Sequence, residues 1–271
     1  MNEKIFGFIG CGNMGSALAT ATRKKLSGSQ ILLANRTEEK AHRLADRLDA
    51  QVADNVTVAE RADYLFLGVK PQMMADMLEE IRDALVDRET PCVLVSMAAG
   101  LTISTIRKMA GVDFPVIRIM PNTPSAIGKG ILLCCANGCE PAQVETFKDV
   151  MSNAGMLDFI EEGMIDAGST ISGCGPAFAC LLMEALADGG VACGLPRAKA
   201  QTYAAQMLLG TAALALETGM HTGQMKDAVC SPAGSTIQGV RALEARGFRS
   251  AAFEAVIAAY EKTLDLGGNK K

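Results

Sequence analysis

The sequence IFGFIGCGNMG, at residues 5–15, joins a short apolar run to a glycine-rich turn and the start of a helical pattern. The apolar run 5–9 predicts a buried β-strand. The turn fits the spacing G-x-G-x-x-G and consists of Gly10, Cys11, Gly12, Asn13, Met14 and Gly15. Between a strand and a helix, this spacing is typical of a turn that binds the pyrophosphate of a dinucleotide, although a purely structural turn has the same composition.

Outward from this turn, short apolar runs alternate with stretches that have helical periodicity. We expect strands at 5–9, 30–34, 64–69, 92–96, 116–120, 130–135 and 156–160, and helices at 13–26, 38–48, 72–86 and 147–153. This alternation predicts an α/β region with a Rossmann-type parallel sheet and crossover helices. We assign residues 1–162 to this dinucleotide-binding domain.

The composition changes after Glu162, where Ala, Leu, Met and Gly recur at helical spacing. Pro176 suits the first turn of a helix. The stretch 198–217 is apolar on more than one face, and a helix of that kind has to be buried. A region of this size can hardly bury several such helices by itself. Residues 163–271 are therefore expected to form an all-helical domain that packs against a partner subunit, with 267–271 as a frayed tail.

The end of the second expected strand indicates which dinucleotide is bound. Proteins specific for NAD usually carry an Asp or Glu there, which accepts hydrogen bonds from the ribose. This chain has Asn35, Arg36 and Thr37 instead, and a guanidinium can bind a 2′-phosphate through two hydrogen bonds. NADP(H) is the predicted cofactor, with NAD(H) as a weaker alternative. The competing interpretation is that Arg36 is solvated and that Glu38 or Glu39 serves the ribose.

Further cofactor contacts are expected where other strands end, because an open parallel sheet presents its ligand crevice at the carboxyl ends of its strands. Lys70 lies near phosphate or ribose in this interpretation and is a solvated surface residue in the competing one. The full set of additional candidates is Asn55, Val69, Lys70, Pro71, Met97, Ala98, Ala99, Pro121 and Asn122.

Composition excludes several other classes of function. The net charge is −4 and no long Lys/Arg run occurs, so nucleic-acid binding is not expected. The nine cysteines form no CxxC pair and only two histidines are present, so we expect reduced packing cysteines, no metal site and a cytoplasmic location. The sequence has no run of about 18 uninterrupted apolar residues, so a membrane span is not expected.

A second glycine-containing loop, SPAGST at 231–236, precedes another helical pattern. Small residues in such a loop can leave backbone N–H groups free for an anion such as a carboxylate, and Thr236 adds a hydroxyl. A helix cap made by Ser235 or Thr236 is the alternative interpretation. The local chemistry does not decide between the two.

Further motifs along the chain are VKP at 69–71, RIMPNTP at 118–124, SGCGPAF at 172–178, DGGVACGL at 188–195, GVRALE at 239–244 and GFR at 247–249. Together with the glycine turn and the 231–236 loop, they give the chain a resemblance to the pyrroline-5-carboxylate reductases along nearly its whole length. This resemblance implies a Rossmann domain followed by a helical domain that forms intertwined homodimers, which can assemble further, for example into a decamer. It also implies reduction of L-1-pyrroline-5-carboxylate to L-proline, the last step of proline biosynthesis.

The resemblance also implies roles for particular residues. The substrate carboxylate would lie on the backbone of Gly234, Ser235 and Thr236, with the Thr236 hydroxyl near the imine nitrogen as the catalytic group. Ser231, Gly175 and Pro176 complete the expected substrate site, and the nicotinamide would lie near Met97, Ala98 and Pro121. The chain departs from the family pattern at Cys174, often Ser, and at Gly219 and Ala228, where some members carry Glu and Asn.

Two competing functions are compatible with a Rossmann domain joined to a helical one. A β-hydroxyacid dehydrogenase would carry a catalytic Lys and Asn on the helix after Gly175, but PAFACLLMEA at 176–185 contains neither. A non-catalytic dinucleotide sensor would not need the second polar loop at 231–236.

Overall fold

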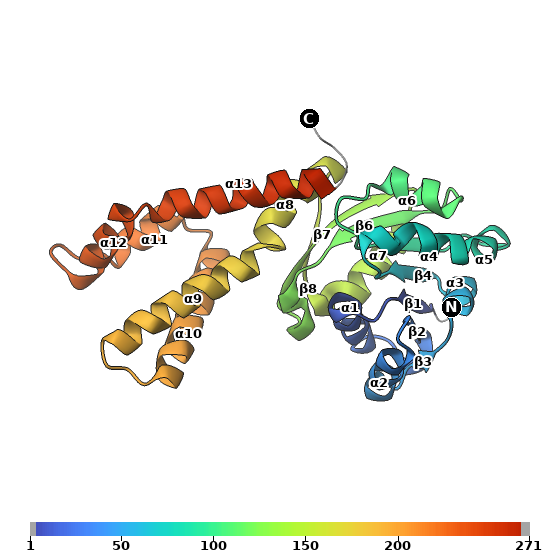
Figure 1. Ribbon diagram of the computed structural model, residues 1–271, viewed down its shortest axis with the longest axis horizontal. Helices are drawn as coiled ribbons and strands as arrows, with labels where there is room; N and C mark the ends of the chain where they lie inside the picture. Colours follow the sequence, from blue (N-terminus) through green and yellow to red (C-terminus); the bar gives the residue numbers. More distant parts are fainter. Residues whose placement is uncertain (1–3, 267–271) are drawn as a thin grey trace. The chain divides into compact units, whose positions relative to one another are not determined.

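The computed structural model describes residues 4–266 and shows two compact units (Figure 1). One unit contains the chain up to Gly173 and again from Ala259, and the other is Cys174–Ala258. The tail expected at 267–271 lies outside the described residues. We call the two parts the sheet unit and the helical unit.

The sheet unit is built on one eight-stranded sheet with the order β3-β2-β1-β4-β5-β6-β7-β8. The strands are β1 (Phe6–Ile9), β2 (Ile31–Ala34), β3 (Gln51–Val52), β4 (Tyr64–Leu67), β5 (Val93–Ser96), β6 (Val116–Met120), β7 (Gly130–Asn137) and β8 (Gly155–Phe159). All neighbours are parallel except β6 and β7, which are antiparallel. The β6–β7 connection holds only the 3₁₀ turn η3 (Thr123–Ile127), and a parallel crossover needs about a dozen residues or more. The predicted α/β class with a Rossmann-type sheet is confirmed, with this reversal as the difference.

Helices cover both faces of this sheet. They are α1 (Asn13–Arg23), α2 (Glu38–Leu48), α3 (Asn55–Arg61), α4 (Met74–Glu80), α5 (Arg82–Val86), α6 (Ile103–Ala110), α7 (Pro141–Met151) and α8 (Glu162–Ser172), with short 3₁₀ turns η1 (Gly28–Gln30), η2 (Pro71–Met73) and η4 (Ser152–Ala154). Side chains of α1, α2 and α7 belong to one buried cluster, and those of α3 to α6 belong to the other. The helix expected at 72–86 is divided into η2, α4 and α5.

Side chains along the central strands point alternately to the two faces of the sheet and so contribute to both buried clusters. Phe6 and Phe8 of β1 face one side, where Phe6 stacks on Tyr64 at 4.5 Å between ring centroids and Phe8 stacks on Phe66 at 4.3 Å. Ile9 belongs to the cluster on the other side. Because the core fixes the strands on both faces, the loops at their carboxyl ends have a rigid base.

The helical unit contains α9 (Gly175–Ala192), α10 (Arg197–Thr218), α11 (Thr222–Ala228), α12 (Ser235–Ala245) and most of α13 (Phe248–Leu266). Pro176 lies in the first turn of α9, as expected. A turn that includes Gly194, with a φ of 96°, joins α9 to α10, and Gly219 ends α10 in the left-handed conformation. The departure from the family pattern at Gly219 thus coincides with a helix cap that favours glycine.

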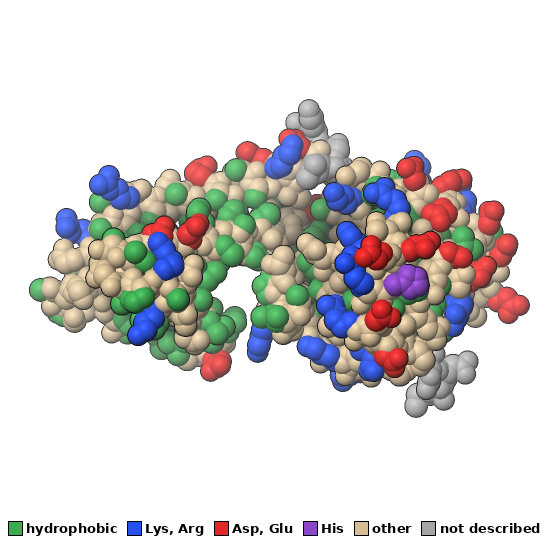
Figure 2. Space-filling model, turned by 60° about the horizontal axis from the view of Figure 1, so that its bottom comes forward, with side chains coloured by type: hydrophobic (Ala, Val, Ile, Leu, Met, Phe, Trp, Pro, Cys, Tyr) green, Lys and Arg blue, Asp and Glu red, His purple; other side chains and the backbone are tan. Residues whose placement is uncertain are grey.

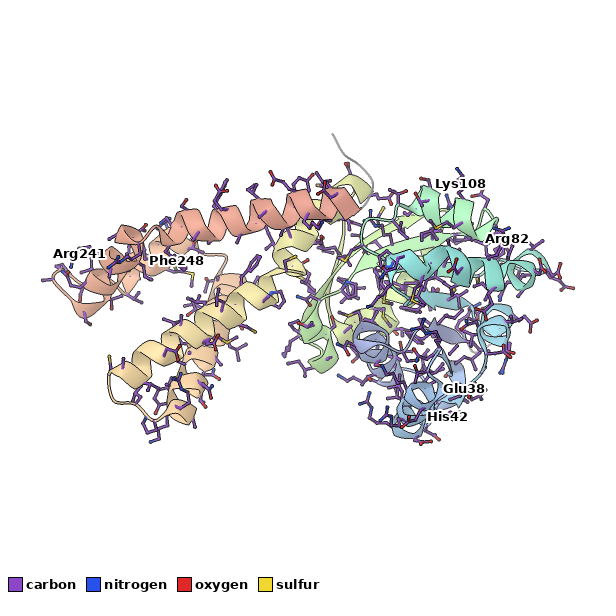
Figure 3. All side chains as sticks on the ribbon, viewed as in Figure 1. Glu38, His42, Arg82, Lys108, Arg241 and Phe248 are labelled. Atoms are coloured by element: carbon purple, nitrogen blue, oxygen red, sulfur yellow. The ribbon has the colours of Figure 1, made fainter. Side chains whose placement is uncertain are left out.

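The helical unit has almost no core of its own. Among its described residues, the buried hydrophobic ones are Ala187, Ala200 and Ala204. Large apolar side chains lie at the surface instead (Figure 2), and Phe248 at the start of α13 is one of them (Figure 3). The set also includes Leu181, Leu186, Tyr203, Met207, Leu209, Leu214, Leu216, Val229, Leu243 and Phe253. The prediction that these helices are not buried within one chain is confirmed for this structure.

One described helical stretch, 162–192, is long and apolar enough to cross a membrane by length and composition alone. It comprises α8 and α9 and carries the acidic residues Glu162, Asp166, Glu184 and Asp188. Only 11% of its most apolar window is buried inside the chain. A helix that packs against a second subunit passes the same test, so this stretch is weak support for a membrane location.

Candidate functional site

The glycine turn after β1 is fixed by close backbone packing. Gly10 has a φ of 104°, and a Cβ there would lie 2.6 Å from the backbone of Gly68, which follows the neighbouring strand β4. A Cβ on Gly15 would overlap the carbonyl oxygen of Gly10. These two glycines are therefore required by the fold itself.

Gly12 is different, because a Cβ there would meet nothing within 4 Å. It is the N-cap of α1, no side chain caps the helix, and no acidic residue lies in its first turn. The first intrahelical bond of this end is donated by Ser16 to Gly12, so the N–H groups of Asn13, Met14 and Gly15 precede it. Free N–H groups beside open space suit a bound pyrophosphate.

A cleft of about 620 Å³ lies at the carboxyl ends of β1, β2 and β4. The strand order reverses at β1, which is where open α/β sheets hold their ligands. The residues that line it are Ile9, Gly10, Gly12, Asn35, Arg36, Thr37, Lys40, Asn55, Gly68, Val69, Lys70, Gln72, Met73, Asp76, Met77 and Glu80. The structure thus brings Gly10, Gly12, Asn35, Arg36, Asn55, Val69 and Lys70 of the predicted set into one cleft.

Two cations face this cleft at the end of β2. Arg36 and Thr37 line it as the sequence analysis proposed, and Lys40, one helical turn further on, lines it as well. Glu38 (labelled in Figure 3) and Glu39 lie in the first turn of α2, and neither is among the lining residues. Sequence reasoning missed Lys40, because Arg36 lies before the N-cap of α2 and helical spacing does not relate the two residues.

Asn35 has its amide engaged inside the protein. Its Oδ1 accepts a hydrogen bond from the N–H of Cys11 at 2.9 Å, and its Nδ2 donates to the carbonyl of Thr37 at 2.9 Å. Asn35 therefore ties the end of β2 to the glycine turn. Asn55, also in the cleft, donates from Nδ2 to Glu80 at 2.9 Å.

The rest of the glycine turn borders a second hollow, also about 620 Å³ in volume. Cys11, Gly12 and Asn13 line it together with Lys40, and Met14 is half-buried in the first turn of α1. Burial raises the pKa of the Cys11 thiol to about 11, so this cysteine is a packing residue and not a thiolate at neutral pH. All nine cysteines of the chain are free, but only Cys11, Cys92 and Cys134 are buried, and Cys180 and Cys193 are exposed.

The candidates after β5 and β6 lie at neighbouring strand ends but do not line the cleft. Met97, Ala98 and Ala99 follow β5, and Pro121 follows β6. Asn122 is buried, with Nδ2 donating to the carbonyl of Ser172 at 2.9 Å and Oδ1 accepting from the N–H of Ile131 at 3.0 Å. Its amide thus joins the end of α8 to the start of β7. Pro71 is exposed and begins η2.

The 231–236 loop forms a tight turn before α12. The N–H of Gly234 donates to the carbonyl of Ser231 at 3.0 Å, and Ala233 between them has a φ of 60°. Gly234 is the N-cap of α12, so the alternative interpretation of a cap made by Ser235 or Thr236 is wrong: these are the first two helical residues. No side chain caps α12 and its first turn has no acid, which leaves its leading N–H groups for an anion.

Gly175 and Pro176 also lie in the helical unit, in the first turn of α9 with Cys174 as N-cap. Both are half-buried, and a Cβ on Gly175 would meet nothing within 4 Å. Ser231, Ser235 and Thr236 are exposed. The residues of the predicted substrate site are thus in the helical unit, whereas the predicted cofactor residues are in the sheet unit.

The sheet topology, the glycine turn and the cleft at the strand ends are those of a dinucleotide-binding domain. Residues 5–100 match the family described as NADP oxidoreductase coenzyme F420-dependent, which makes the class a dinucleotide-dependent oxidoreductase. Residues 162–266 match the family described as pyrroline-5-carboxylate reductase dimerisation. The chain is 39% identical to the pyrroline-5-carboxylate reductase of Escherichia coli (strain K12), over 97% of this chain and 98% of that one. It belongs to the pyrroline-5-carboxylate reductase family.

Relatives in other kingdoms and solved structures agree with this assignment. Pyrroline-5-carboxylate reductase 3 of Danio rerio is 37% identical, over 98% of this chain and 92% of its own length. The solved pyrroline-5-carboxylate reductase of Coxiella burnetii has a TM-score of 0.88 at 31% identity and covers 98% of this chain and 99% of its own. The Plasmodium falciparum pyrroline carboxylate reductase, solved with NADP bound, has a TM-score of 0.88 at 28% identity, over 98% of this chain and 99% of its own.

Proposed function

We propose that this protein reduces L-1-pyrroline-5-carboxylate to L-proline with NADPH as the hydride donor, and with NADH as a weaker donor. The observation that carries the proposal is the cleft at the strand ends, with the glycine turn, Arg36 and Lys40 in its lining, in a chain that belongs to this family over nearly its whole length. The dehydrogenase alternative loses its support, because the described helix α9 contains neither Lys nor Asn.

In this proposal, NADPH binds in the cleft of the sheet unit. Bound NADPH supplies the hydride from its nicotinamide. The leading N–H groups of α1 hold the pyrophosphate beside Gly12, and Arg36 with Lys40 neutralises the 2′-phosphate. Asn35 and Asn55 act mainly by positioning, because their amides bind other parts of the chain. Met97, Ala98, Ala99, Pro121 and Asn122 form or support the nicotinamide end.

The substrate binds at the 231–236 loop in this proposal. The leading N–H groups of α12 receive the substrate carboxylate, with Ser231, Gly175 and Pro176 shaping the surroundings. A protonated imine is already electrophilic, so the residues have to orient the ring and exclude water without providing a strong acid. The Thr236 hydroxyl orients the ring nitrogen and its proton, which makes it the catalytic group.

The proposal also includes the organisation of the chain. Residues 1–162 are the NADP-binding domain, and 163–271 are the substrate-binding and dimerisation domain, supported by the family match at 162–266. The exposed apolar side chains of the helical unit pair two copies into a homodimer, which assembles further, for example into a decamer. Nine free thiols are consistent with a cytoplasmic enzyme.

Turnover tests the reaction directly. Loss of NADPH absorbance is followed with L-1-pyrroline-5-carboxylate, with NADH in parallel, and the product is identified as proline by amino-acid analysis. Faster turnover with NADPH than with NADH is expected. Turnover favouring NADH would contradict the assignment of Arg36 and Lys40. Tight NADPH binding without turnover would support a dinucleotide sensor instead.

Assembly is tested by placing a charge on the apolar surface of the helical unit. Leu181→Asp is expected to abolish the dimer in sedimentation analysis, because a carboxylate at an interface core is costly to bury. Val86→Asp, at an exposed apolar position of the sheet unit, is the matched control and should stay dimeric. A dimer that survives Leu181→Asp would place the interface elsewhere.

A further inference from the structure

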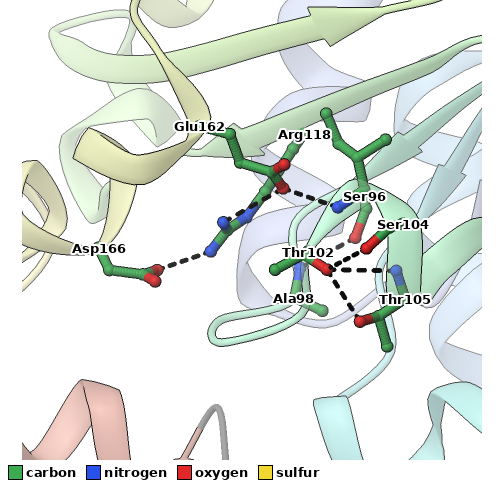
Figure 4. Close-up of polar contacts among 9 residues, drawn as sticks. Ser96, Ala98, Thr102, Ser104, Thr105, Arg118, Glu162 and Asp166 are labelled. Atoms are coloured by element: carbon green, nitrogen blue, oxygen red, sulfur yellow. Dashed lines mark hydrogen bonds and ion pairs between the residues drawn. The ribbon is translucent and has the colours of Figure 1, made fainter. Parts of the chain in front are cut away.

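A buried arginine joins three elements of the sheet unit. Arg118 of β6 is buried, and its guanidinium contacts two carboxylates of α8: Nη2 lies 2.6 Å from Asp166, and Nη1 lies 3.5 Å from Oε1 of Glu162 (Figure 4). The same Oε1 accepts a hydrogen bond from the N–H of Ile103 at 2.7 Å. Ile103 is the first residue of α6, so β6, α8 and α6 meet at one carboxylate oxygen.

These contacts bracket the loop 97–102, which connects β5 to α6. Arg118 pairs in register with Ser96, the last residue before the loop, and Glu162 holds Ile103, the first residue after it. Between Ser96 and Leu101 the hydrogen bonds are long, at 3.4 Å from Ala98 N to the Ser96 hydroxyl and 3.5 Å from Leu101 N to the Ala98 carbonyl. The last loop residue, Thr102, caps α6 and accepts a hydrogen bond from the N–H of Thr105 at 3.2 Å. The loop therefore depends on its two ends for its conformation.

We propose that Arg118 and Glu162 are positioning residues for hydride transfer, because together they fix the 97–102 loop that carries Met97 and Ala98. The inference rests on the proposed function, in which this loop lies at the nicotinamide end of the cofactor. Glu162 acts through its Oε1 as an acceptor, and Arg118 acts by holding that oxygen toward Ile103. Asp166 balances the second half of the guanidinium.

Stability alone does not account for this cluster. Removing the Arg118 charge from water opposes its attraction to Glu162 and Asp166, whose side chains stay 30% and 24% exposed, so these ion pairs are weak evidence for a stabilising role. Arg118 also has an unpaired Nε among the described residues, an additional cost of burial. An arginine at this point of β6 is better explained by the orientation that it imposes on Glu162.

The sharpest test compares two substitutions of the same residue. Glu162→Gln keeps an oxygen that can accept from Ile103 and Arg118, whereas Glu162→Ala removes the acceptor. Glu162→Ala is expected to lower kcat/KM for pyrroline-5-carboxylate by about tenfold or more, in the range that small misplacements cause, and Glu162→Gln should recover most of it. Affinity for 2′,5′-ADP, which probes only the Arg36 end of the cleft, should not change in either variant.

A comparison of Arg118 with Arg107 separates positioning of the 97–102 loop from general stabilisation of β6. Arg107 holds the segment before β6, with Nε donating to the carbonyl of Phe114 at 2.9 Å, and the end of β7, with Nη2 donating to the carbonyl of Asn137 at 3.0 Å. Arg118→Met should lower kcat/KM and speed amide hydrogen exchange across 97–103. Arg107→Met should lower the melting temperature while leaving kcat/KM and exchange in that loop unchanged.

The outcomes separate this inference from the proposed function. Unchanged kcat/KM and unchanged loop exchange in Glu162→Ala would overturn the positioning role in an enzyme whose activity is established. Equal losses of activity in Arg118→Met and Arg107→Met would also overturn it. If the unmodified protein did not turn over the imine, the proposed function would fail, while faster exchange of 97–103 in Glu162→Ala would still show that the carboxylate holds the loop.

Discussion

Two helices of this protein begin with nearly the same local chemistry. Both α1 and α12 have a glycine as N-cap, Gly12 and Gly234, with no side chain capping the helix and no acid in the first turn. Each therefore presents unpaired N–H groups and the positive end of a helix dipole to an anion. In the proposed function one receives a pyrophosphate and the other a carboxylate.

The two sites differ in what holds them in place. The turn before α1 is wedged between strand ends, with Gly10 against Gly68 and the Asn35 amide on the Cys11 N–H. The turn before α12 lies at the surface of the helical unit and includes Ala233 in a left-handed conformation. The first site is preformed by the core of a single chain, whereas the second relies on a short strained turn.

Gly15→Ala should have the largest effect, because its Cβ would overlap the Gly10 carbonyl where neither backbone can move freely. Overpacking of this kind costs about 1–3 kcal/mol of unfolding free energy, and occasionally more. Urea unfolding measures the loss. Gly12→Ala is the control: its Cβ meets nothing, so stability should change little while NADPH affinity falls. Equal destabilisation by Gly15→Ala and Gly12→Ala would mean that close packing at Gly15 does not hold the turn in place.

The fold was largely predictable because burial on both faces of a parallel sheet produces continuous apolar runs. The seven predicted strands are all present, from β1 to β8 with β3 excepted. β3 is two residues long and partly exposed, and so leaves no apolar run to detect. The reversal at β7 depends on a connection too short for a crossover, a feature of spacing that periodicity alone does not reveal.

The candidate site was predictable where glycine or charge imposes a pattern and less so elsewhere. Gly10, Gly12 and Arg36 carry such a pattern, and the cleft contains all three. Asn35 and Asn122 were predicted to contact cofactor, yet their amides bind the protein's own backbone. The positions of such partners follow from tertiary packing, which one sequence without a structure does not specify.

The next largest effect is expected at Arg36. Arg36→Ala should raise the KM for NADPH about tenfold or more and leave the KM for NADH nearly unchanged, because a charge-assisted contact to phosphate contributes about 1.5–3 kcal/mol. Lys40→Ala should act in the same direction but less strongly, since Lys lacks the bidentate geometry of Arg. Glu38→Ala, in the same turn but outside the cleft lining, is the control for each cofactor. Equal effects of Arg36→Ala on NADPH and NADH would refute the 2′-phosphate assignment.

A smaller loss is expected at the second helix terminus. Thr236→Ala should lower kcat/KM for pyrroline-5-carboxylate by about tenfold, the consequence of one lost hydrogen bond to a charged group. Thr236→Ser, which keeps the hydroxyl, should retain most of the activity, and NADPH binding should be unaffected in both. Unchanged kcat/KM in Thr236→Ala would remove this hydroxyl from the reaction.

The smallest effect, and the one that most directly tests the difference between the two termini, is expected at Ala233. A φ of 60° costs a non-glycine residue roughly 1–2 kcal/mol of backbone strain. Gly removes this strain but loses more conformational entropy on folding, so only part of the strain energy is recovered as stability. Ala233→Gly should therefore raise the unfolding free energy by about 0.5 kcal/mol while lowering kcat/KM a few-fold, because the turn before α12 becomes less rigid. Asp49→Gly is the matched control, since Asp49 is the other described non-glycine residue with positive φ, at the end of α2. It should change stability slightly and leave kcat/KM unchanged. If Ala233→Gly behaves like Asp49→Gly, the strain at 233 is incidental, and the second site needs no rigidity beyond that of α12 itself.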